Sequence, residues 1–354
     1  MKIPTEPIGS IPRPARLITA IDQAGDYADP SLDPLFEKAI RDTIREFEAT
    51  GSPIITDGEQ RKYHNFWTYS VHGLPNTAPD GFKIPFSAGH VRRMPRLTAG
   101  PFRYKVYADR YLDVAKRFAH SPLKQAVISP SALSLMYPAE DIPGYSRQEF
   151  IDDLLREHEM EIRRCFEKGA SKVQIDFTEG RLAVKLDPSG DLLNSFIGLN
   201  NLALSRFTPE ERQSIGVHTC PGGDLDSTHS ADVDYADLLP SLFELRAGNF
   251  YIELAGEKDR ERVLKMIRQY LKPDQRAFVG VISPIDPRVD RPEEVRDRVL
   301  EAAKYIPLEQ LGTTDDCGFA PFSDDTSTTR ETAFAKIRAR VEGTRLAEEI
   351  LWNR

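Results

Sequence analysis

Short apolar segments rich in β-forming residues alternate with longer charged segments along almost the whole 354-residue chain. The short segments are predicted to be eight strands, at 3–9, 53–57, 125–129, 172–176, 214–218, 249–253, 277–282 and 308–314. In the long segments, apolar residues recur at spacings of three and four, which is typical of helices packed on one face. The clearest predicted helices are 34–49, 147–168, 234–246, 257–271, 292–305 and 327–350. Alternating strands and helices in this number favour the α/β class, as a single (β/α)8 TIM barrel over residues 1–354.

One connection is much longer than the others. Residues 58–123 separate the second and third predicted strands, so we expect a long insertion there, with its own aromatic and basic residues. An open doubly wound sheet is the alternative architecture. It has less support, because no Gly-rich phosphate-binding loop follows the first predicted strand.

Charge and apolar patterning narrow the class of protein. The formal net charge is −8, whereas a duplex nucleic-acid binder needs a basic surface. No apolar run reaches the ~18 residues that a membrane-spanning helix needs. The first residues carry no apolar signal segment, so a cytoplasmic location is expected. The three cysteines are odd in number and widely spaced, which predicts buried thiols or metal ligands rather than a disulfide framework.

Polar residues follow the predicted strands at the points where each strand ends. In a (β/α)8 barrel these carboxyl-terminal ends carry the chemistry. The residues in question are Gly9 and Ser10, Asp57 and Glu59, Asp176, His218 and Cys220, Glu253, and Asp315 to Cys317. A buried strand has no structural need to end in this way, so these residues are candidates for a functional site.

Four of these residues have side chains that bind zinc. They are His218, Cys220, Glu253 and Cys317, and zinc accepts sulfur, imidazole and carboxylate ligands in a tetrahedral arrangement. The two-residue spacing puts His218 and Cys220 on the same side of an extended segment. Each residue has a simpler alternative as a core thiol, a core histidine or an ion-paired carboxylate. Cys165 is expected to be a core residue. The remaining histidines show no ligand spacing: His64, His72, His90, His120, His158 and His229.

Six motifs give the chain a resemblance to a known family. They are "IGSIPRP" from residue 8, "TDGEQR" from residue 56, "QID" from residue 174, "HTC" from residue 218, "YIE" from residue 251 and "DDCGF" from residue 315. In this order they resemble the C-terminal catalytic barrel of cobalamin-independent methionine synthase and its short single-barrel relatives. The resemblance implies a (β/α)8 barrel with a catalytic Zn2+ held by His218, Cys220, Glu253 and Cys317.

The resemblance also implies a binding site for an amino-acid thiol such as homocysteine. A cation lowers the pKa of a bound thiol, and the thiolate is the nucleophile for methyl transfer. Glu59 and Asp176 would bind the substrate ammonium through charge-assisted hydrogen bonds. Ile8, Gly9 and Ser10 would receive its carboxylate. The alternative for the two acids is a salt bridge at the barrel mouth with Arg13 or Arg61.

The sequence departs from the family pattern on the methyl-donor side. The family has a general-acid histidine after strand seven, but that loop reads "VISPIDPRVD" here, with Asp286 as the nearest ionisable substitute. Asp286 is therefore the candidate catalytic acid. The "PGGD" that follows Cys220 also differs from the synthase loop.

Three functions remain open on the sequence alone. The first is methyl transfer to homocysteine or a similar thiol, with a corrinoid or a folate as candidate donor. The second resembles epoxyalkane:coenzyme M transferase, in which Arg92, Arg93 and Arg96 would hold a sulfonate. The third is a non-catalytic zinc-binding barrel. The first two need a small-molecule thiol and a methyl or alkyl donor as partners.

Overall fold

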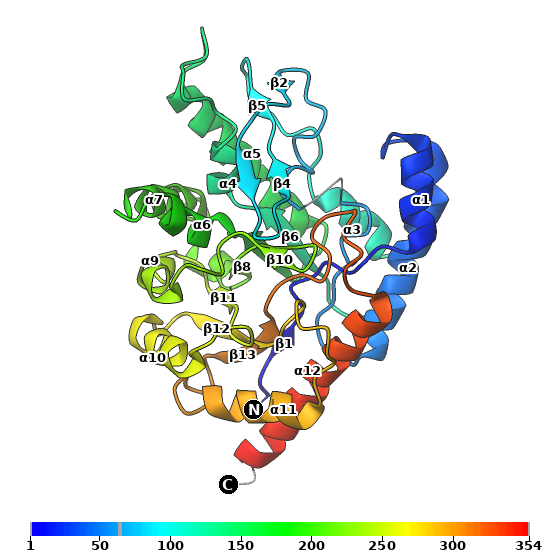
Figure 1. Cartoon of the computed structure of the whole chain (residues 1–354), viewed down its shortest axis with the longest axis vertical. Helices are drawn as coiled ribbons and strands as arrows, with labels where there is room; N and C mark the ends of the chain where they lie inside the picture. Colours follow the sequence, from blue (N-terminus) through cyan, green and yellow to red (C-terminus); the bar gives the residue numbers. More distant parts are fainter. Residues whose placement is uncertain (1, 63–65, 353–354) are drawn as a thin grey trace.

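The computed structural model describes residues 2–62 and 66–352 and is built around a curled, TIM-barrel-like parallel sheet (Figure 1). The sheet has seven strands in the order β1-β13-β12-β11-β8-β7-β6, and all neighbouring strands run parallel. The strands are β1 (Thr5–Glu6), β6 (Lys124–Ile128), β7 (Lys172–Asp176), β8 (Ile215–Thr219), β11 (Asn249–Ile252), β12 (Arg276–Ile282) and β13 (Leu311–Asp315). Each corresponds to a predicted strand, with small shifts at the ends.

The predicted strand at 53–57 is the exception, since it is not a regular strand. Ile55 makes only an isolated parallel bridge with Leu123, at the entry to β6. On the other side, the Thr56 hydroxyl donates to the carbonyl oxygen of Gly9, just after β1, over 2.7 Å. The segment therefore lies between the two edge strands of the sheet. Pro53 lacks an N–H and cannot extend the ladder.

Helices surround the sheet, and five of the six predicted helices are confirmed. These are α2 (Asp33–Ala49), α5 (Arg147–Glu167), α10 (Arg260–Tyr270), α11 (Pro292–Ala302) and α12 (Arg330–Trp352). The Thr329 hydroxyl accepts from the N–H of Thr332 at the start of α12, and Pro292 occupies the first turn of α11.

The predicted helix at 234–246 is wrong as a single element. It is divided into the 3-10 turn η2 (Tyr235–Asp237) and the short α9 (Leu239–Leu242). Pro240 lies in the first turn of α9, where its missing N–H is tolerated, but it could not sit inside a longer helix. The prediction also missed α1 (Ala15–Ala24), η1 (Pro30–Leu32), α3 (Asp109–Ala115), α4 (Pro130–Ser134), α6 (Glu179–Leu186), α7 (Asp191–Leu204) and α8 (Pro209–Arg212).

The small sheets formed between Ile55 and β6 lie toward one end of the molecule, above the main sheet in Figure 1. Between Ile55 and β6 the chain forms two antiparallel pairs, which are β2 (Thr77–Ala78) with β5 (Arg96–Leu97) and β3 (Lys83–Pro85) with β4 (Val91–Arg93). A third pair follows β8 and consists of β9 (Gly223–Asp224) and β10 (Ser227–Thr228). The backbone N–H of Ser87 donates to the carbonyl of Thr228, so the β3–β4 turn rests on the β9–β10 pair.

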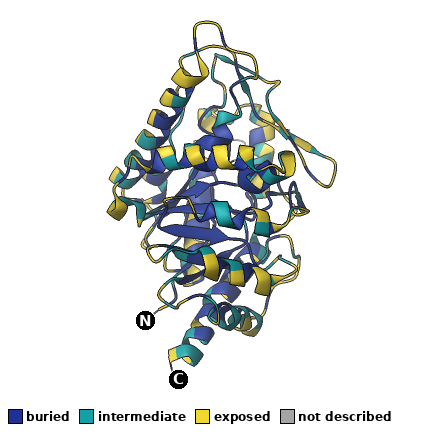
Figure 2. Cartoon of the chain, turned by 90° about the vertical axis from the view of Figure 1, so that its left-hand side faces the viewer, coloured by how far each residue is buried: buried dark blue, intermediate teal, exposed yellow. Residues whose placement is uncertain are grey.

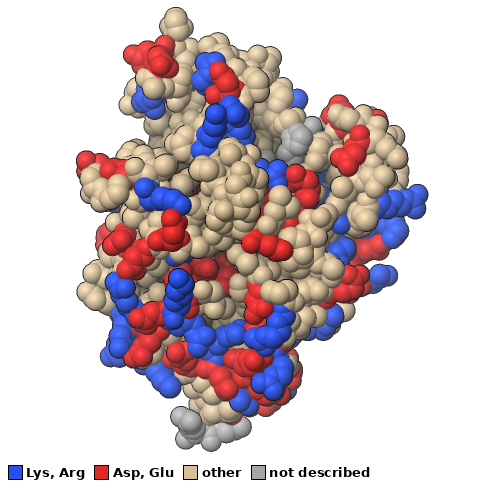
Figure 3. All heavy atoms as spheres, viewed as in Figure 1, with Lys and Arg blue, Asp and Glu red and all other residues tan. Residues whose placement is uncertain are grey.

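The core lies between the sheet and the helices. The strands are buried along their lengths, whereas the helices expose one side to solvent (Figure 2). Charged side chains of both signs gather over α10, α11 and α12 in the lower part of the face shown in Figure 3. Within the described residues, no helix combines the length and the apolar character that crossing a membrane requires.

Candidate functional site

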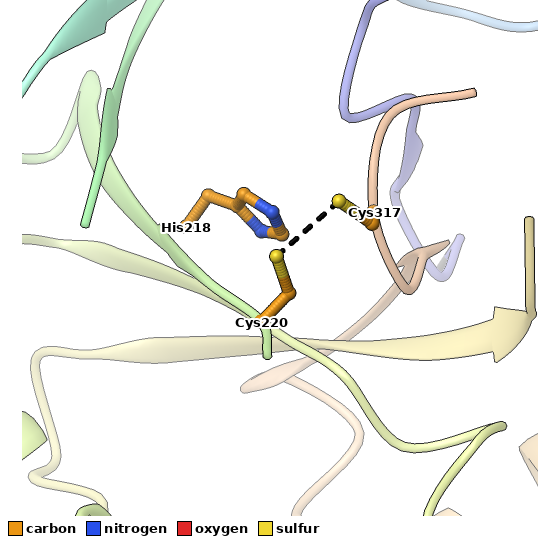
Figure 4. Close-up of side chains that lie close together, drawn as sticks. All are labelled: His218, Cys220 and Cys317. Carbon is orange, nitrogen blue, oxygen red and sulfur yellow. Dashed lines mark hydrogen bonds between the residues drawn. The ribbon is translucent and has the colours of Figure 1, made fainter. Parts of the chain in front are cut away.

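Three of the four predicted zinc ligands meet at the carboxyl end of the sheet. His218 lies in β8, Cys220 follows that strand directly, and Cys317 follows β13. One potential ligand atom from each residue lies within 4.8 Å of the other two. The two sulfurs are 3.2 Å apart, with the imidazole of His218 beside them (Figure 4). Cys220 and Cys317 are 97 positions apart in the sequence and thus converge in space, as expected for strand ends of one parallel sheet.

The His218 ring is oriented for binding through Nε2. Its Nδ1 donates to the backbone carbonyl of Tyr251 over 3.3 Å, and the side chain is only 2% exposed. Nε2 is buried without a hydrogen-bond partner. A buried polar atom normally has a partner, so Nε2 is the ring nitrogen left to bind a metal ion together with the two sulfurs.

The two thiols differ in acidity. The Cys220 thiol donates to the Cys317 sulfur, which lowers the pKa of Cys317 well below its usual value and raises that of Cys220. The neighbouring His218 also lowers the pKa of Cys317. A thiolate is the form that binds metal, so the donor set of imidazole and two sulfurs fits a zinc ion.

Glu253 lies close to the ligand group of His218, Cys220 and Cys317 but is not part of it. Its carboxylate accepts from Arg181 Nη1 over 3.1 Å, as an ion pair in which both side chains are largely buried. Burial and the nearby Asp316 carboxylate raise the pKa of Glu253 well above its usual value. Asp316 in turn accepts three backbone N–H groups from residues 254–256 and so fixes the loop after β11. The predicted fourth ligand is therefore adjacent to the sulfurs while its carboxylate contacts an arginine.

A pocket opens beside the sulfur pair, with about 480 Å3 of empty space that includes solvent at its mouth. Six of the residues singled out from the sequence line it, namely Ile8, Ser10, Glu59, Asp176, His218 and Cys317. They come from the ends of β1, β7, β8 and β13 and from the segment after Thr56. The strand-end pattern in the sequence therefore did identify one common cavity.

The two acids of the cavity are both buried. Glu59 accepts a hydrogen bond from Lys62 Nζ over 3.0 Å, and Asp176 accepts one from Gln174 Nε2 over 2.8 Å. Burial raises the pKa of Asp176 to about 6, and the Glu59 carboxylate adds to this rise while Lys62 opposes it. The predicted alternative, a salt bridge with Arg13 or Arg61, is not what the structure has. Arg13 donates to backbone carbonyls, including that of Glu59 over 2.7 Å.

The segment from Ile8 to Ser10 uses most of its polar groups internally. The N–H of Ile8 donates to Asp315 over 3.2 Å, and the Ser10 hydroxyl accepts from the N–H of Ala320 over 3.2 Å. Gly9 has a φ of 145°, which favours glycine, and its carbonyl accepts from Thr56. Ser10 lines the cavity, and a serine hydroxyl can donate as well as accept.

Asp286 is not brought to the cavity. It is partly exposed in the loop after β12, where it accepts from the N–H of Arg288 over 2.9 Å. Two arginines of the basic segment 91–97 also bind acidic side chains that do not line the cavity. Arg92 binds Asp224 and Asp324, and Arg96 binds Asp80.

His229 is a cavity residue that the sequence analysis did not single out. It packs directly on Gly222, where an added Cβ would lie 1.8 Å from Nε2. In the same loop, buried Asp224 accepts from Arg92 and contacts His90 over 2.8 Å. The "PGGD" turn thus places a histidine over the cavity and anchors the β3–β4 hairpin. His64 lies outside the described residues.

Gly222→Ala is expected to destabilise the protein by about 1–3 kcal/mol, because Gly222 has a φ of 72° and no space for a Cβ. Chemical denaturation of the two proteins measures the difference. Gly223→Ala is the matched control, since its added Cβ would have Cys317 Sγ as nearest neighbour at an ordinary 3.8 Å. An equal effect of the two substitutions would contradict the role given to Gly222.

Comparisons with known proteins agree with this arrangement. A family model described as "Cobalamin-independent synthase, Catalytic domain" matches residues 3–344. A methionine synthase from Sulfurisphaera tokodaii is 24% identical over 99% of this chain and 94% of its own. A B12-independent methionine synthase from Shewanella sp. W3-18-1, solved with selenomethionine, has a TM-score of 0.77, 18% identity and full coverage of both chains. A putative B12-independent methionine synthase from Listeria monocytogenes has a TM-score of 0.70 and 22% identity over 99% of each chain.

The family model spans nearly the whole chain, and its span includes the three converging ligands and every predicted cavity residue. The solved relatives share the fold from end to end. This chain therefore belongs to the cobalamin-independent methionine synthase family, in the class of its catalytic domain.

Proposed function

We propose that this protein is a zinc-dependent methyltransferase that activates homocysteine, or a similar amino-acid thiol, as a thiolate. The observation that carries the proposal is the convergence of His218 Nε2 and two thiol sulfurs beside a buried acidic cavity. Zinc would supply the positive charge that keeps a substrate thiol deprotonated near neutral pH. Family membership favours methyl transfer over epoxide opening and over a non-catalytic barrel.

His218, Cys220 and Cys317 would hold the zinc, with Glu253 as the fourth ligand. Support for Glu253 comes from its position after β11, the strand next to β8, and from its closeness to both sulfurs, since Cys317 raises the pKa of Glu253 and Glu253 raises the pKa of Cys220. Arg181 would hold the Glu253 carboxylate whenever it is not bound to the metal.

The remaining cavity residues would bind the amino-acid part of the substrate. Glu59 and Asp176 are two buried carboxylates with spare oxygen atoms, which suit an ammonium group. Ser10 would donate to the substrate carboxylate, and Ile8 and Gly9 would shape this end of the cavity. Asp286 would serve as the catalytic acid if the loop after β12 moved toward the cavity.

We also propose that residues 1–354 form one (β/α)8 domain in which 53–57 completes the barrel as an eighth strand. The bridge at Ile55 and the Thr56–Gly9 hydrogen bond support this closure. Residues 58–123 would then be the long insertion between the second and third barrel strands.

Zinc-edge X-ray absorption tests the choice of thiol. We expect homocysteine to add one sulfur neighbour to the zinc of the loaded protein, and coenzyme M to add none. Addition of a sulfur from coenzyme M alone would favour the epoxide-opening alternative. Spectra unchanged by either thiol would contradict thiol activation.

Asp176→Asn is expected to raise the KM for homocysteine about ten- to a hundredfold, because a charge-assisted bond to the ammonium is lost. The substitution should also reduce the preference for homocysteine over 4-mercaptobutanoate, which lacks the amino group, because Glu59 alone is left to bind the ammonium. Steady-state kinetics with both thiols measures this. Glu179→Gln is the control, since Glu179 is also buried after β7 but binds Ser129 and Ser131. A preference for homocysteine that is unchanged in Asp176→Asn would contradict this role.

A further inference from the structure

The cavity beside the sulfur pair has a narrow mouth. Glu59, Asp176 and His218 line the cavity and are only 7%, 4% and 2% exposed. Side chains that water hardly reaches cannot be reached by an amino-acid thiol, which is much larger than a water molecule. Part of the cavity wall must therefore move before such a substrate can enter.

Two parts of this wall are held firmly. The ends of β1, β7, β8 and β13 belong to the buried main sheet. The β9–β10 pair is tied to β8, since the N–H groups of His229 and Ser230 both donate to the carbonyl of Pro221, which follows directly after the predicted ligand at position 220. Lys185 in α6 also donates to the carbonyl of His229 over 2.9 Å. Movement of either part would displace the predicted zinc ligands.

The β3–β4 hairpin, residues 83–93, is attached in a different way. It is a separate two-stranded sheet, and a two-stranded hairpin is only marginally stable by itself. It contributes Ile84 and Phe86 to the cavity wall, whereas most of its other side chains are exposed. The Phe86 ring meets Phe322 and His229 edge-on, with centroid distances of 6.2 and 5.5 Å. The hairpin thus covers the cavity through a small apolar contact.

Charged contacts hold this hairpin against the rest of the protein. Arg92 donates through Nε and Nη2 to both carboxylate oxygens of Asp224, over 2.6 and 3.0 Å. Arg92 also donates to Asp324 over 2.8 Å, and His90 contacts Asp224 over 2.8 Å. The Asp224 side chain is 0% exposed, so water could solvate its carboxylate only after the hairpin lifted. Hydration would then offset much of the attraction that is lost on opening.

We propose that the β3–β4 hairpin is a gate over the thiol-binding cavity, and that it lifts to admit the substrate, with Arg92 and Asp224 as its latch. That the substrate is an amino-acid thiol rests on the function proposed above. The closed gate keeps water away from the sulfur pair and the buried acids, which strengthens the electrostatic interactions there. Arg92 acts on the hairpin rather than on the substrate, since it is not among the described residues that line the cavity.

A covalent bridge between Ser87 in the hairpin and Ser227 in β10 tests the gate. Their hydroxyl oxygens lie 3.4 Å apart, so cysteines at both positions could be joined by dibromobimane, a short reagent that forms two thioether bonds. Homocysteine cannot break these bonds, as it could break a disulfide. We expect homocysteine to add one sulfur to the zinc of the unbridged double variant and none to that of the bridged protein. Zinc-edge X-ray absorption measures both.

Ser87→Cys treated with the same reagent is the matched control, because it carries the added group while its hairpin stays free. It should still bind homocysteine. Treated wild-type protein checks that zinc protects Cys220 and Cys317 from the reagent. A sulfur added in the bridged protein, or a bridge that does not form, would overturn the gate while the proposed function stands. If homocysteine adds no sulfur in untreated wild-type protein, the proposed function fails instead.

Arg92→Met tests the latch without any substrate. The substitution leaves the buried Asp224 carboxylate without its guanidinium partner, so the hairpin should open more often. Amide hydrogen exchange of residues 83–93 should become about tenfold faster, as expected for loss of a charge-assisted contact. Arg96→Met is the control, since it removes only an exposed ion pair with Asp80 and should leave this exchange unchanged. Equal exchange in Arg92→Met and wild-type protein would contradict the latch.

Discussion

Cys317→Ser is expected to abolish zinc binding and to lower methyl transfer by more than about a hundredfold, while the fold stays intact. A serine hydroxyl is a far poorer zinc ligand than a thiolate, and even changes beyond the ligand shell cost 10–100-fold. The fold should survive, because the extensive apolar core does not depend on the metal. Metal analysis, activity and thermal unfolding of the same preparation measure the three effects.

Cys165→Ala is the matched control for this substitution. Cys165 is also a buried thiol, but it lies in α5 and outside the three-residue ligand group. It should therefore retain its zinc content and activity. Loss of cooperative unfolding in Cys317→Ser would instead indicate a structural metal, and unchanged zinc content would contradict the ligand assignment.

Arg340→Met is expected to destabilise the protein by about 3–5 kcal/mol, which is the usual cost of leaving one partner of a buried ion pair unpaired. Arg340 is 0% exposed in α12. It donates to the Asp315 carboxylate over 2.7 Å and to the backbone carbonyl of Glu6 over 2.9 Å. The residue thus ties the last helix to β13 and β1, the strands that lead into Cys317 and Ile8. Urea denaturation measures the loss.

Two further variants separate the buried charge from general effects of the substitution. Arg345→Met, on the exposed side of the same helix, removes ion pairs with Glu342 and Glu349 and should cost no more than about 1 kcal/mol. Asp315→Asn added to Arg340→Met should recover part of the loss, because the asparagine oxygen can still accept from Ile8 while the unpaired charge is gone. An equal loss of unfolding free energy in Arg340→Met and Arg345→Met would contradict the role given to the buried ion pair.

The parts of the fold with a strong hydrophobic period were predictable from the sequence. Strand β7 matches its predicted range, and α2, α5 and α11 begin within one residue of theirs. The segment 53–57 reads as a strand because of its isoleucines, but its single bridge depends on where the two edges of the sheet meet. The helix predicted at 234–246 was wrong although Pro240 indicates a break there. The helical spacing of the apolar residues was given more weight than this proline.

The candidate site was predictable where it follows the strand ends. His218, Cys220 and Cys317 converge because parallel strands bring their carboxyl ends to one edge. The orientation of Glu253 was not predictable, since Arg181 is far away in sequence and spacing does not reveal its contact. His229 was missed for the same reason, although the two glycines before Asp224 signal a close approach of the backbone to another group.

The zinc content of the purified protein, measured together with the alkylation of its thiols at native pH, tests the central claim most directly. We predict about one zinc per chain, as for a catalytic site of this ligand type. Cys220 and Cys317 should be protected from alkylation until a chelator removes the metal. A protein that carries no zinc and in which both thiols are freely alkylated would contradict the account.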